Sequence, residues 1–259
     1  MRKALILLSL PVLLVALAAA GSAGASRHVT TGTSFKYCDN PTFPPMENQT
    51  KGGKPTGFDI DFANALGKQM GGTATFVFSS FSGLLPALGA QRCDVVISGI
   101  FITPDRTKQF PAVAYMHSHR ALIVAGGNPK HITSPNGLKG MSVAVQAGTK
   151  YEQYLKTLKS KLGFTLNSYP GDTDAIGQIL IGRADAVLSQ DTSAAYAMSK
   201  HPGKVAIGYL FPATDKFGVY YRKGDAIGGE IAAAIKALKA NGTMVKLAKK
   251  YNIPTGDVK

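Results

Sequence analysis

The chain has 259 residues, of which 45% are hydrophobic and 17% are charged. This composition is typical of a globular protein and excludes a disordered or fibrous one. The net charge of +14 is scattered along the chain and forms no basic patch interleaved with aromatic residues, so we expect a solvated basic surface and no nucleic acid partner. The glycine pairs lack the spacing of a phosphate or dinucleotide loop, and we expect no cofactor.

The first 25 residues have the pattern of a cleaved export signal. Met1-Arg2-Lys3 is basic, residues 4–20 are almost wholly apolar, and Ala23-Gly24-Ala25 offers small residues for cleavage. A membrane anchor is the weaker alternative, because the apolar run contains Pro11 and is at the low end of the length that a span requires. We therefore expect cleavage near Ala25 and a periplasmic mature protein.

The remaining chain alternates strand-like and helix-like segments, which is typical of parallel α/β architecture. Strands are predicted over residues 34–38, 74–78, 94–98, 120–125, 141–146, 184–189, 204–209 and 217–222. Helices are predicted over residues 59–70, 82–90, 104–109, 150–162, 173–181, 191–200, 225–240 and 242–250. Residues 40–56, rich in proline and glycine, are predicted to form a loop over a binding site.

An arginine follows closely after one of these helix starts. Thr103 is a predicted N-cap and Pro104 the first helical residue, so Arg106 falls in the first turn, at the positive end of the helix dipole. A bound carboxylate or phosphate would make this position favourable, because the guanidinium and free backbone N–H groups would hold it together. The alternative is a surface arginine that pairs with Asp105 or is solvated.

A second helix start offers similar chemistry. Thr149 and Glu152 have capping-box spacing, and the glycine turn Ala147-Gly148 precedes them. Free backbone N–H groups at this start are a second place where an anion could bind.

The two cysteines, Cys38 and Cys93, would be exported to an oxidising compartment, where disulfides form. Cys38 ends one predicted strand and Cys93 begins another. In adjacent parallel strands these positions would be far apart, at about 3.3 Å per residue, so we expect two free thiols. The histidines of His117-Ser118-His119 are the sole metal candidate, and alternating histidines of this kind are more often surface residues; we expect no metal site.

Five motifs in succession resemble those of polar-amino-acid solute-binding proteins, the extracytoplasmic receptors of ABC importers. They are GFDIDFANAL (57–66), FSGLLPAL (81–88), DVVISGIFITPDR (94–106), GLKGMSVAVQAGT (137–149) and GRADAVL (182–188). The resemblance implies an α/β protein with the two-lobed periplasmic-binding-protein fold, a ligand cleft and two crossovers between the lobes, near residues 116–120 and 212–218. It implies lobe 1 from residues 26–116 plus 215–259 and lobe 2 from residues 117–214.

The same resemblance implies a monomer that binds a small carboxylate or amino-acid ligand and delivers it to the membrane subunits of an ABC importer. Arg106 falls where the family binds the ligand α-carboxylate, and the helix start at Thr149 and Lys150 donates to the same group. Phe43 and Phe81 fall where aromatic rings flank the ligand. The remaining positions implied to contact the ligand are Ser98, Gly99, the specificity position Gln146, and Asp39 or Asn40 at its distal end.

Two positions depart from the family pattern at the ligand's α-ammonium group. Phe101 stands where a Ser or Thr hydroxyl is usual, and Gln190 aligns with the usual carboxylate, with Asp191 one residue later. Moving an ammonium group from water into a binding site that has no carboxylate partner costs roughly several kcal/mol. The ligand is therefore either an amino acid bound through Asp191 or Asp39, or a carboxylate that lacks a conventional α-amine.

The rival from another class is an enzyme, since cyclohexadienyl dehydratases resemble this family and keep its arginine. Their catalytic glutamate follows the glycine-threonine turn by two residues, where this chain has Tyr151, and Glu152 comes one residue later. Because a general acid or base must be positioned in the cleft, we expect a binding protein and no enzyme.

Overall fold

The computed structural model describes residues 32–259, and the predicted export signal lies outside this range. One eight-stranded sheet runs through the molecule in the order β4-β1-β5-β10-β6-β9-β7-β8. Its strands are β1 (Ser34–Asp39), β4 (Thr73–Phe78), β5 (Val95–Val96), β6 (Ala112–Ala125), β7 (Ser142–Gln146), β8 (Thr165–Tyr169), β9 (Ala186–Gln190) and β10 (Val205–Tyr221). A separate ribbon consists of β2 (Asn48–Gln49) and β3 (Pro55–Thr56).

Residues 32–259 contain eight α-helices, of which the first six lie between strands and the last two follow β10. They are α1 (Phe58–Gln69), α2 (Leu84–Gly89), α3 (Pro104–Gln109), α4 (Lys150–Leu162), α5 (Asp172–Leu180), α6 (Asp191–Lys200), α7 (Ile227–Ala240) and α8 (Thr243–Lys250). Local signals set their ends: α4 begins at Thr149, whose hydroxyl accepts from the Glu152 N–H, and ends at Gly163 with a left-handed φ of 68°.

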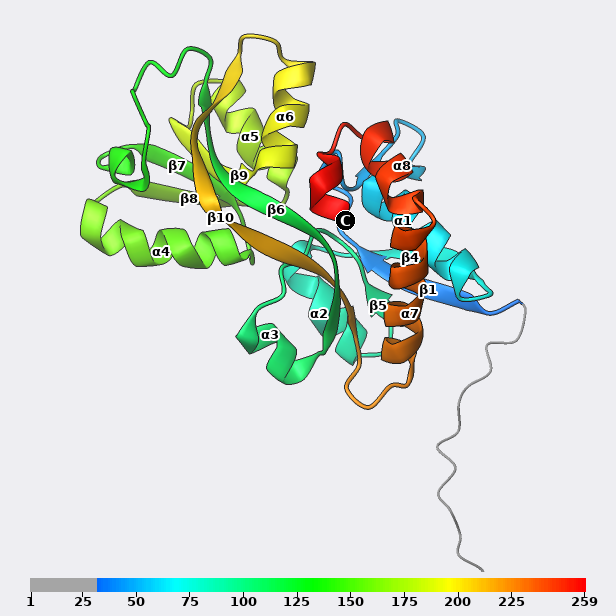
Figure 1. Ribbon diagram of the computed structural model, residues 1–259. Helices are drawn as coiled ribbons and strands as arrows, with labels where there is room; N and C mark the ends of the chain where they lie inside the picture. The colour runs from blue at the N-terminus through cyan, green and yellow to red at the C-terminus, as the bar shows by residue number, and fades with distance from the viewer. Residues whose placement is uncertain (1–31) are drawn as a thin grey trace, which may run out of the picture.

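The long strands β6 and β10 divide the molecule into two lobes (Figure 1). They pair with each other antiparallel along most of their length. Towards one end β10 pairs with β5, and β5 leads to β1 and β4; towards the other end β6 pairs with β9, and β9 leads to β7 and β8. The chain thus passes between the lobes in two adjacent strands, which confirms the predicted two-lobed α/β fold.

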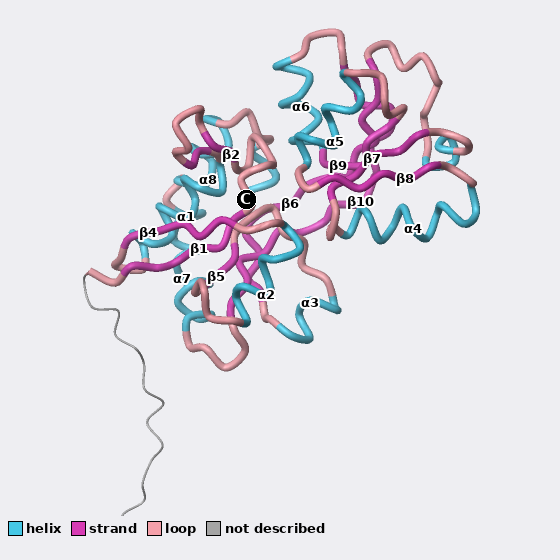
Figure 2. Tube along the Cα trace, turned by 180° about the vertical axis from the view of Figure 1, so that it is seen from behind, coloured by secondary structure: helices cyan, strands magenta, loops and turns pink. Residues whose placement is uncertain are grey.

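Helices cover both faces of the sheet in each lobe, as Figure 2 shows from behind. In the lobe that contains β1, α1 packs with α7 and α8, while α2 packs on β1 and β5. In the other lobe α4 lies on one side of β7 and β8, and α5 and α6 lie on the opposite side (Figure 1). This covering buries the short strands β5, β7 and β9, each of which contains an apolar run.

The strands β6 and β10, which cross between the lobes, are longer than the sequence predicts. β6 begins at Ala112, eight residues before the predicted strand 120–125, and β10 joins two strands that were predicted separately. The added residues lack a strand-like alternation, and β10 shows three register shifts. These residues are extended because β6 and β10 pair with each other. The sequence of either segment alone does not reveal this pairing.

The prediction of two free thiols is wrong, because Cys38 and Cys93 form a disulfide. β5 has two residues rather than the predicted five, so Cys93 lies in the turn that enters it and not in a regular strand. The backbone of Asp94 still bonds to the carbonyl of Lys36, and the turn brings the Cα atoms of the two cysteines to 5.6 Å. This separation is within the range that a disulfide spans.

Within residues 32–259, no helix is both long and apolar enough to cross a membrane. The same residues contain no group of three or more His, Cys, Asp or Glu side chains arranged to hold a metal ion. His119 instead bonds through Nδ1 to the carbonyl of Phe211 at 3.0 Å.

Candidate functional site

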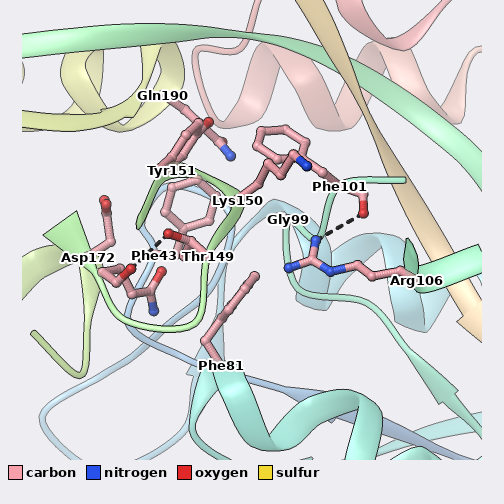
Figure 3. Close-up of a pocket in the computed structure, with 11 residues that line it drawn as sticks. Phe43, Phe81, Gly99, Phe101, Arg106, Thr149, Lys150, Tyr151, Asp172 and Gln190 are labelled. Atoms are coloured by element: carbon pink, nitrogen blue, oxygen red, sulfur yellow. Dashed lines mark hydrogen bonds between the residues drawn. The ribbon is translucent and has the colours of Figure 1, made fainter. Parts of the chain in front are cut away.

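A pocket lies between the two lobes, and nine residues expected at the site line it (Figure 3). These nine are Phe43, Phe81, Gly99, Phe101, Arg106, Gln146, Thr149, Lys150 and Gln190. Tyr151 and Asp172 line the pocket as well. The pocket therefore collects residues from loops and helix starts of both lobes, as a ligand cleft requires.

Arg106 supplies the positive charge of one wall. Its side chain is partly buried, one Nη donates to the carbonyl of Phe101 at 3.0 Å, and its guanidinium lies 5.7 Å from the centre of the Phe81 ring. No carboxylate among the described residues forms an ion pair with it. Burial lowers the pKa of Arg106, but a guanidinium stays charged in proteins, so it can bind an anion in the pocket.

The start of α4 adds backbone donors to the pocket. The Thr149 hydroxyl donates to the Gln146 carbonyl at 2.7 Å and accepts from the Glu152 N–H at 3.1 Å, while Glu152 accepts from the Gly148 N–H at 2.9 Å. These bonds fix the turn. The first N–H groups of an α-helix have no hydrogen-bond partner within the helix, and they form the positive end of its dipole. An anion is stabilised there.

Aromatic rings form much of the remaining wall. The Phe101 ring stacks on Phe217 with centroids 5.1 Å apart and meets Tyr151 edge-on at 5.3 Å. The backbone of Gly99 has a positive φ of 50°, and a Cβ there would lie 2.6 Å from the Phe43 ring. Gly99 is thus required for the close approach of Phe43, and Phe101 is held as part of an aromatic stack.

Four expected site residues, Asp39, Asn40, Ser98 and Asp191, lie outside the pocket wall. Asn40 is directly behind it, since its Oδ1 accepts from the Gln146 Nε2 at 2.9 Å. The Asp191 carboxylate accepts from the Ser118 hydroxyl and from the Thr192 N–H, both at 2.8 Å. Asp191 is therefore engaged with the crossing strand β6.

Ser98 and Asp39 belong to a buried acidic cluster at the base of the lobe that contains β1. The Ser98 hydroxyl donates to Glu47 at 2.7 Å, and Asp59 accepts from the Gly99 N–H at 2.7 Å and from the Tyr115 hydroxyl at 2.8 Å. Burial, aided by the neighbouring carboxylates, raises the pKa of Asp39 and of Glu47, and burial raises that of Asp59 to about 6. The cluster supports the Gly99 turn from behind.

Hydrogen bonds join the two lobes across the pocket. The Thr173 N–H donates to the Thr42 carbonyl at 3.2 Å, and the Ser193 hydroxyl donates to the Pro44 carbonyl at 3.4 Å. Together with the bond between Gln146 and Asn40 they hold the lobes in contact. The structure is thus a closed form of the cleft.

Residues 35–254 match the bacterial extracellular solute-binding proteins, family 3. The chain belongs to this family. It is 31% identical to the lysine/arginine/ornithine-binding periplasmic protein of Escherichia coli (strain K12), over 97% of each chain. Among solved structures, an ancestral arginine-binding protein bound to arginine is 32% identical, with a TM-score of 0.80 over 86% of this chain and 99% of that one.

A second solved structure bears on the expectation that the protein is no enzyme. It is the ancestral amino acid-binding protein AncCDT-1, a precursor of cyclohexadienyl dehydratase, and it is 31% identical with a TM-score of 0.76 over 84% of this chain and 95% of that one. The family match confirms the resemblance inferred from the five sequence motifs, and both of these solved structures are named as amino-acid-binding proteins.

Two pocket residues of this family 3 protein were missed from the sequence as ligand contacts. The sequence points to Tyr151 only as the residue that stands where a catalytic glutamate would be, and its hydroxyl is buried beside the Gln190 side chain. Asp172 is the first residue of α5, is 3% exposed, and accepts from the hydroxyls of Ser189, at 2.6 Å, and of Ser193. Strand β8, which positions α5, was not predicted, so no signal directed Asp172 towards the pocket.

Proposed function

We propose that this protein is the extracytoplasmic substrate-binding component of an ABC importer and that it clamps an amino-acid-type carboxylate between its two lobes. One observation carries the proposal: Arg106 is a partly buried cation that lines the pocket between the lobes and has no carboxylate partner among the described residues. A buried charge is stable only with a partner, and a ligand carboxylate supplies it.

Arg106 and the start of α4 hold the carboxylate in this account, and the rings of Phe43 and Phe81 flank the rest of the ligand. Gly99, Gln146, Lys150 and the departures Phe101 and Gln190 complete the proposed contact set. Support comes from the shared pocket wall and from the sequence similarity to amino-acid-binding proteins.

The proposed lobes are residues 26–116 plus 215–259 and residues 117–214. Their boundaries fall within β6 and β10, where Ser118 pairs with Asp215 and Arg120 forms an ion pair with Asp215 at 2.9 Å. We propose that the lobes close by hinge motion at these strands. The mature protein is a periplasmic monomer, cleaved near Ala25, that docks on the importer's membrane subunits.

Catalysis is not part of the proposal. Glu152, the acid nearest to the dehydratase position, accepts from the Gly148 N–H and the Ser168 hydroxyl and pairs with Lys156 at 2.9 Å. These bonds lower the pKa of Glu152 against the opposing effect of burial. Glu152 thus caps α4 and is not available as a general acid.

Calorimetric titration tests the proposed function. The wild-type protein is screened with the common amino acids and with matched hydroxy-acids and keto-acids, and each ligand found is repeated with Arg106→Ala and with Arg92→Ala, an exposed arginine outside the pocket. We expect Arg106→Ala to abolish binding without unfolding the protein and Arg92→Ala to bind normally. Unchanged affinity in Arg106→Ala would remove the carboxylate clamp from the account.

A further inference from the structure

The pocket contains a buried carboxylate that forms no ion pair within residues 32–259. Asp172 is 3% exposed and lines the pocket, and no Lys, Arg or His among the described residues forms an ion pair with it. Its only hydrogen-bond donors are the neutral hydroxyls of Ser189 and Ser193. Desolvation of an unpaired carboxylate is unfavourable, so a cation supplied from outside would stabilise it.

Asp172 and Arg106 lie on opposite sides of the pocket (Figure 3). One comes from α5 in the lobe that contains β7, and the other comes from α3 in the lobe that contains β1. Each is an unpaired charge, and the two charges have opposite sign. A ligand that neutralises both must carry a carboxylate at one end and a cation at the other.

Other carboxylates near the pocket cannot take this cation. Asp191 is bonded to Ser118 and lies outside the pocket wall, and Asp39 lies in the acidic cluster behind Gly99. On the Arg106 side, the pocket is lined by the Phe101 ring, which is packed between Phe217 and Tyr151. A cationic group next to the ligand carboxylate would therefore meet an aromatic stack.

We propose that Asp172 binds the ligand's ammonium group and that the ligand is an ω-amino acid, an amino carboxylate whose ammonium stands away from its carboxylate. This inference rests on the proposed function, because it takes Arg106 as the carboxylate site. In this proposal the carboxylate that binds the ligand's ammonium is Asp172 at the start of α5, whereas the sequence resemblance implies a carboxylate at the position of Gln190.

The surroundings of Asp172 suit an ammonium. The two serine hydroxyls orient the carboxylate and leave it further lone pairs, since a carboxylate accepts at about four sites. The Gln190 side chain and the Tyr151 hydroxyl are buried, line the same pocket and interact with each other. An ammonium has three donors, so these groups can accept those that Asp172 does not use.

Calorimetry with pairs of isomers tests the inference. The ω-amino acids are 4-aminobutyrate, 5-aminovalerate and 6-aminohexanoate, each compared with its α-amino isomer, and lysine, ornithine and valerate complete the set. We expect at least one ω-amino acid to bind at least about tenfold more tightly than its isomer. Equal or tighter binding of the α-isomers would overturn the inference.

Variants separate this inference from the proposed function. Asp172→Asn keeps the size of the side chain, and it should weaken the best zwitterion by about 30-fold or more while valerate binds as well as before or better. Asp174→Asn, an exposed carboxylate on the same helix, should bind like the wild type. Amino-acid binding that depends on Arg106 but not on Asp172 contradicts the inference alone, whereas binding independent of Arg106 contradicts the proposed function.

If no zwitterion in the set binds, the proposed ligand class is wrong. Valerate and the common amino acids, titrated against Arg106→Ala, then decide whether the proposed function stands. Circular dichroism of each variant verifies that it is folded.

Discussion

Local sequence signals were sufficient to predict the positive half of the pocket. Thr103 and Thr149 act as N-caps as their spacing indicates, and this places Arg106 and the amides of α4 at the pocket wall. The negative half was not predictable in this way. Asp172 is adjacent to Ser189 and Ser193 only because β8, β9 and α6 come together in the folded lobe.

The sequence resemblance implies a Ser or Thr hydroxyl at the position where this chain has Phe101. Phe101→Ser would remove the ring that stacks on Phe217 and restore a hydroxyl, and with Gln190→Asp it would restore both usual ammonium contacts. We expect the double variant to gain affinity for α-amino acids relative to their ω-isomers, by about tenfold or more, when both are titrated by calorimetry.

The cavity left by the ring should lower the free energy of unfolding by about 3 kcal/mol, a typical value for a buried phenylalanine. Denaturant titration of the same variant measures this loss. An unaltered preference between isomers would show that Phe101 does not exclude the α-ammonium.

Whole elements were predicted well where they are local and poorly where they depend on pairing. Helices α3 and α4 have the predicted bounds, because caps and a left-handed glycine mark their ends. The disulfide and the full length of β6 and β10 were missed, because both follow from contacts between distant segments. The acidic cluster was missed for the same reason, since Asp39 alone among its carboxylates was expected at the site.

The start of α5 contacts Thr42 of the opposite lobe, and a substitution at this contact tests whether the two lobes must close to bind the ligand. Gly171 has an ordinary φ of −120°, but a Cβ there would lie 2.9 Å from the Thr42 Cβ in the opposite lobe. Gly171→Ala should therefore hinder closure without straining the backbone, and ligand affinity should fall by about tenfold, the effect of about 1.4 kcal/mol.

Gly177→Ala on the same helix is the matched control, because a Cβ there meets nothing within 4 Å. It should keep the wild-type affinity. If calorimetry gives Gly171→Ala the wild-type affinity as well, the contact between α5 and Thr42 is not needed in the ligand-bound form.

For the whole molecule, buried carboxylates make stability depend on pH in an unusual direction. Burial raises the pKa of Asp59 and of Asp172 to about 6, and the pKa values of Asp39 and Glu47 are also raised. The folded state then binds more protons than the unfolded state, whose carboxyl groups titrate near 4. The stabilisation from these groups is complete below about pH 4 and is lost as the pH rises through about 6.

We therefore expect the ligand-free protein to have a larger free energy of unfolding at about pH 5 than at about pH 7, as measured by denaturant titration. Asp172→Asn and Asp59→Asn should each reduce this difference, because a neutral side chain does not titrate. A stability that rises between these two pH values would contradict the assignment of raised pKa values.

The central claim is that two unpaired charges on opposite sides of one cleft hold the two ends of a zwitterion. A crystal structure of the protein with the best-binding amino carboxylate tests it most directly. The account predicts the ligand carboxylate about 3 Å from the Arg106 guanidinium and the ammonium at a similar distance from the Asp172 carboxylate. A ligand carboxylate that is distant from Arg106, or an ammonium held at Gln190 or Asp191 with Asp172 unbound, would contradict it.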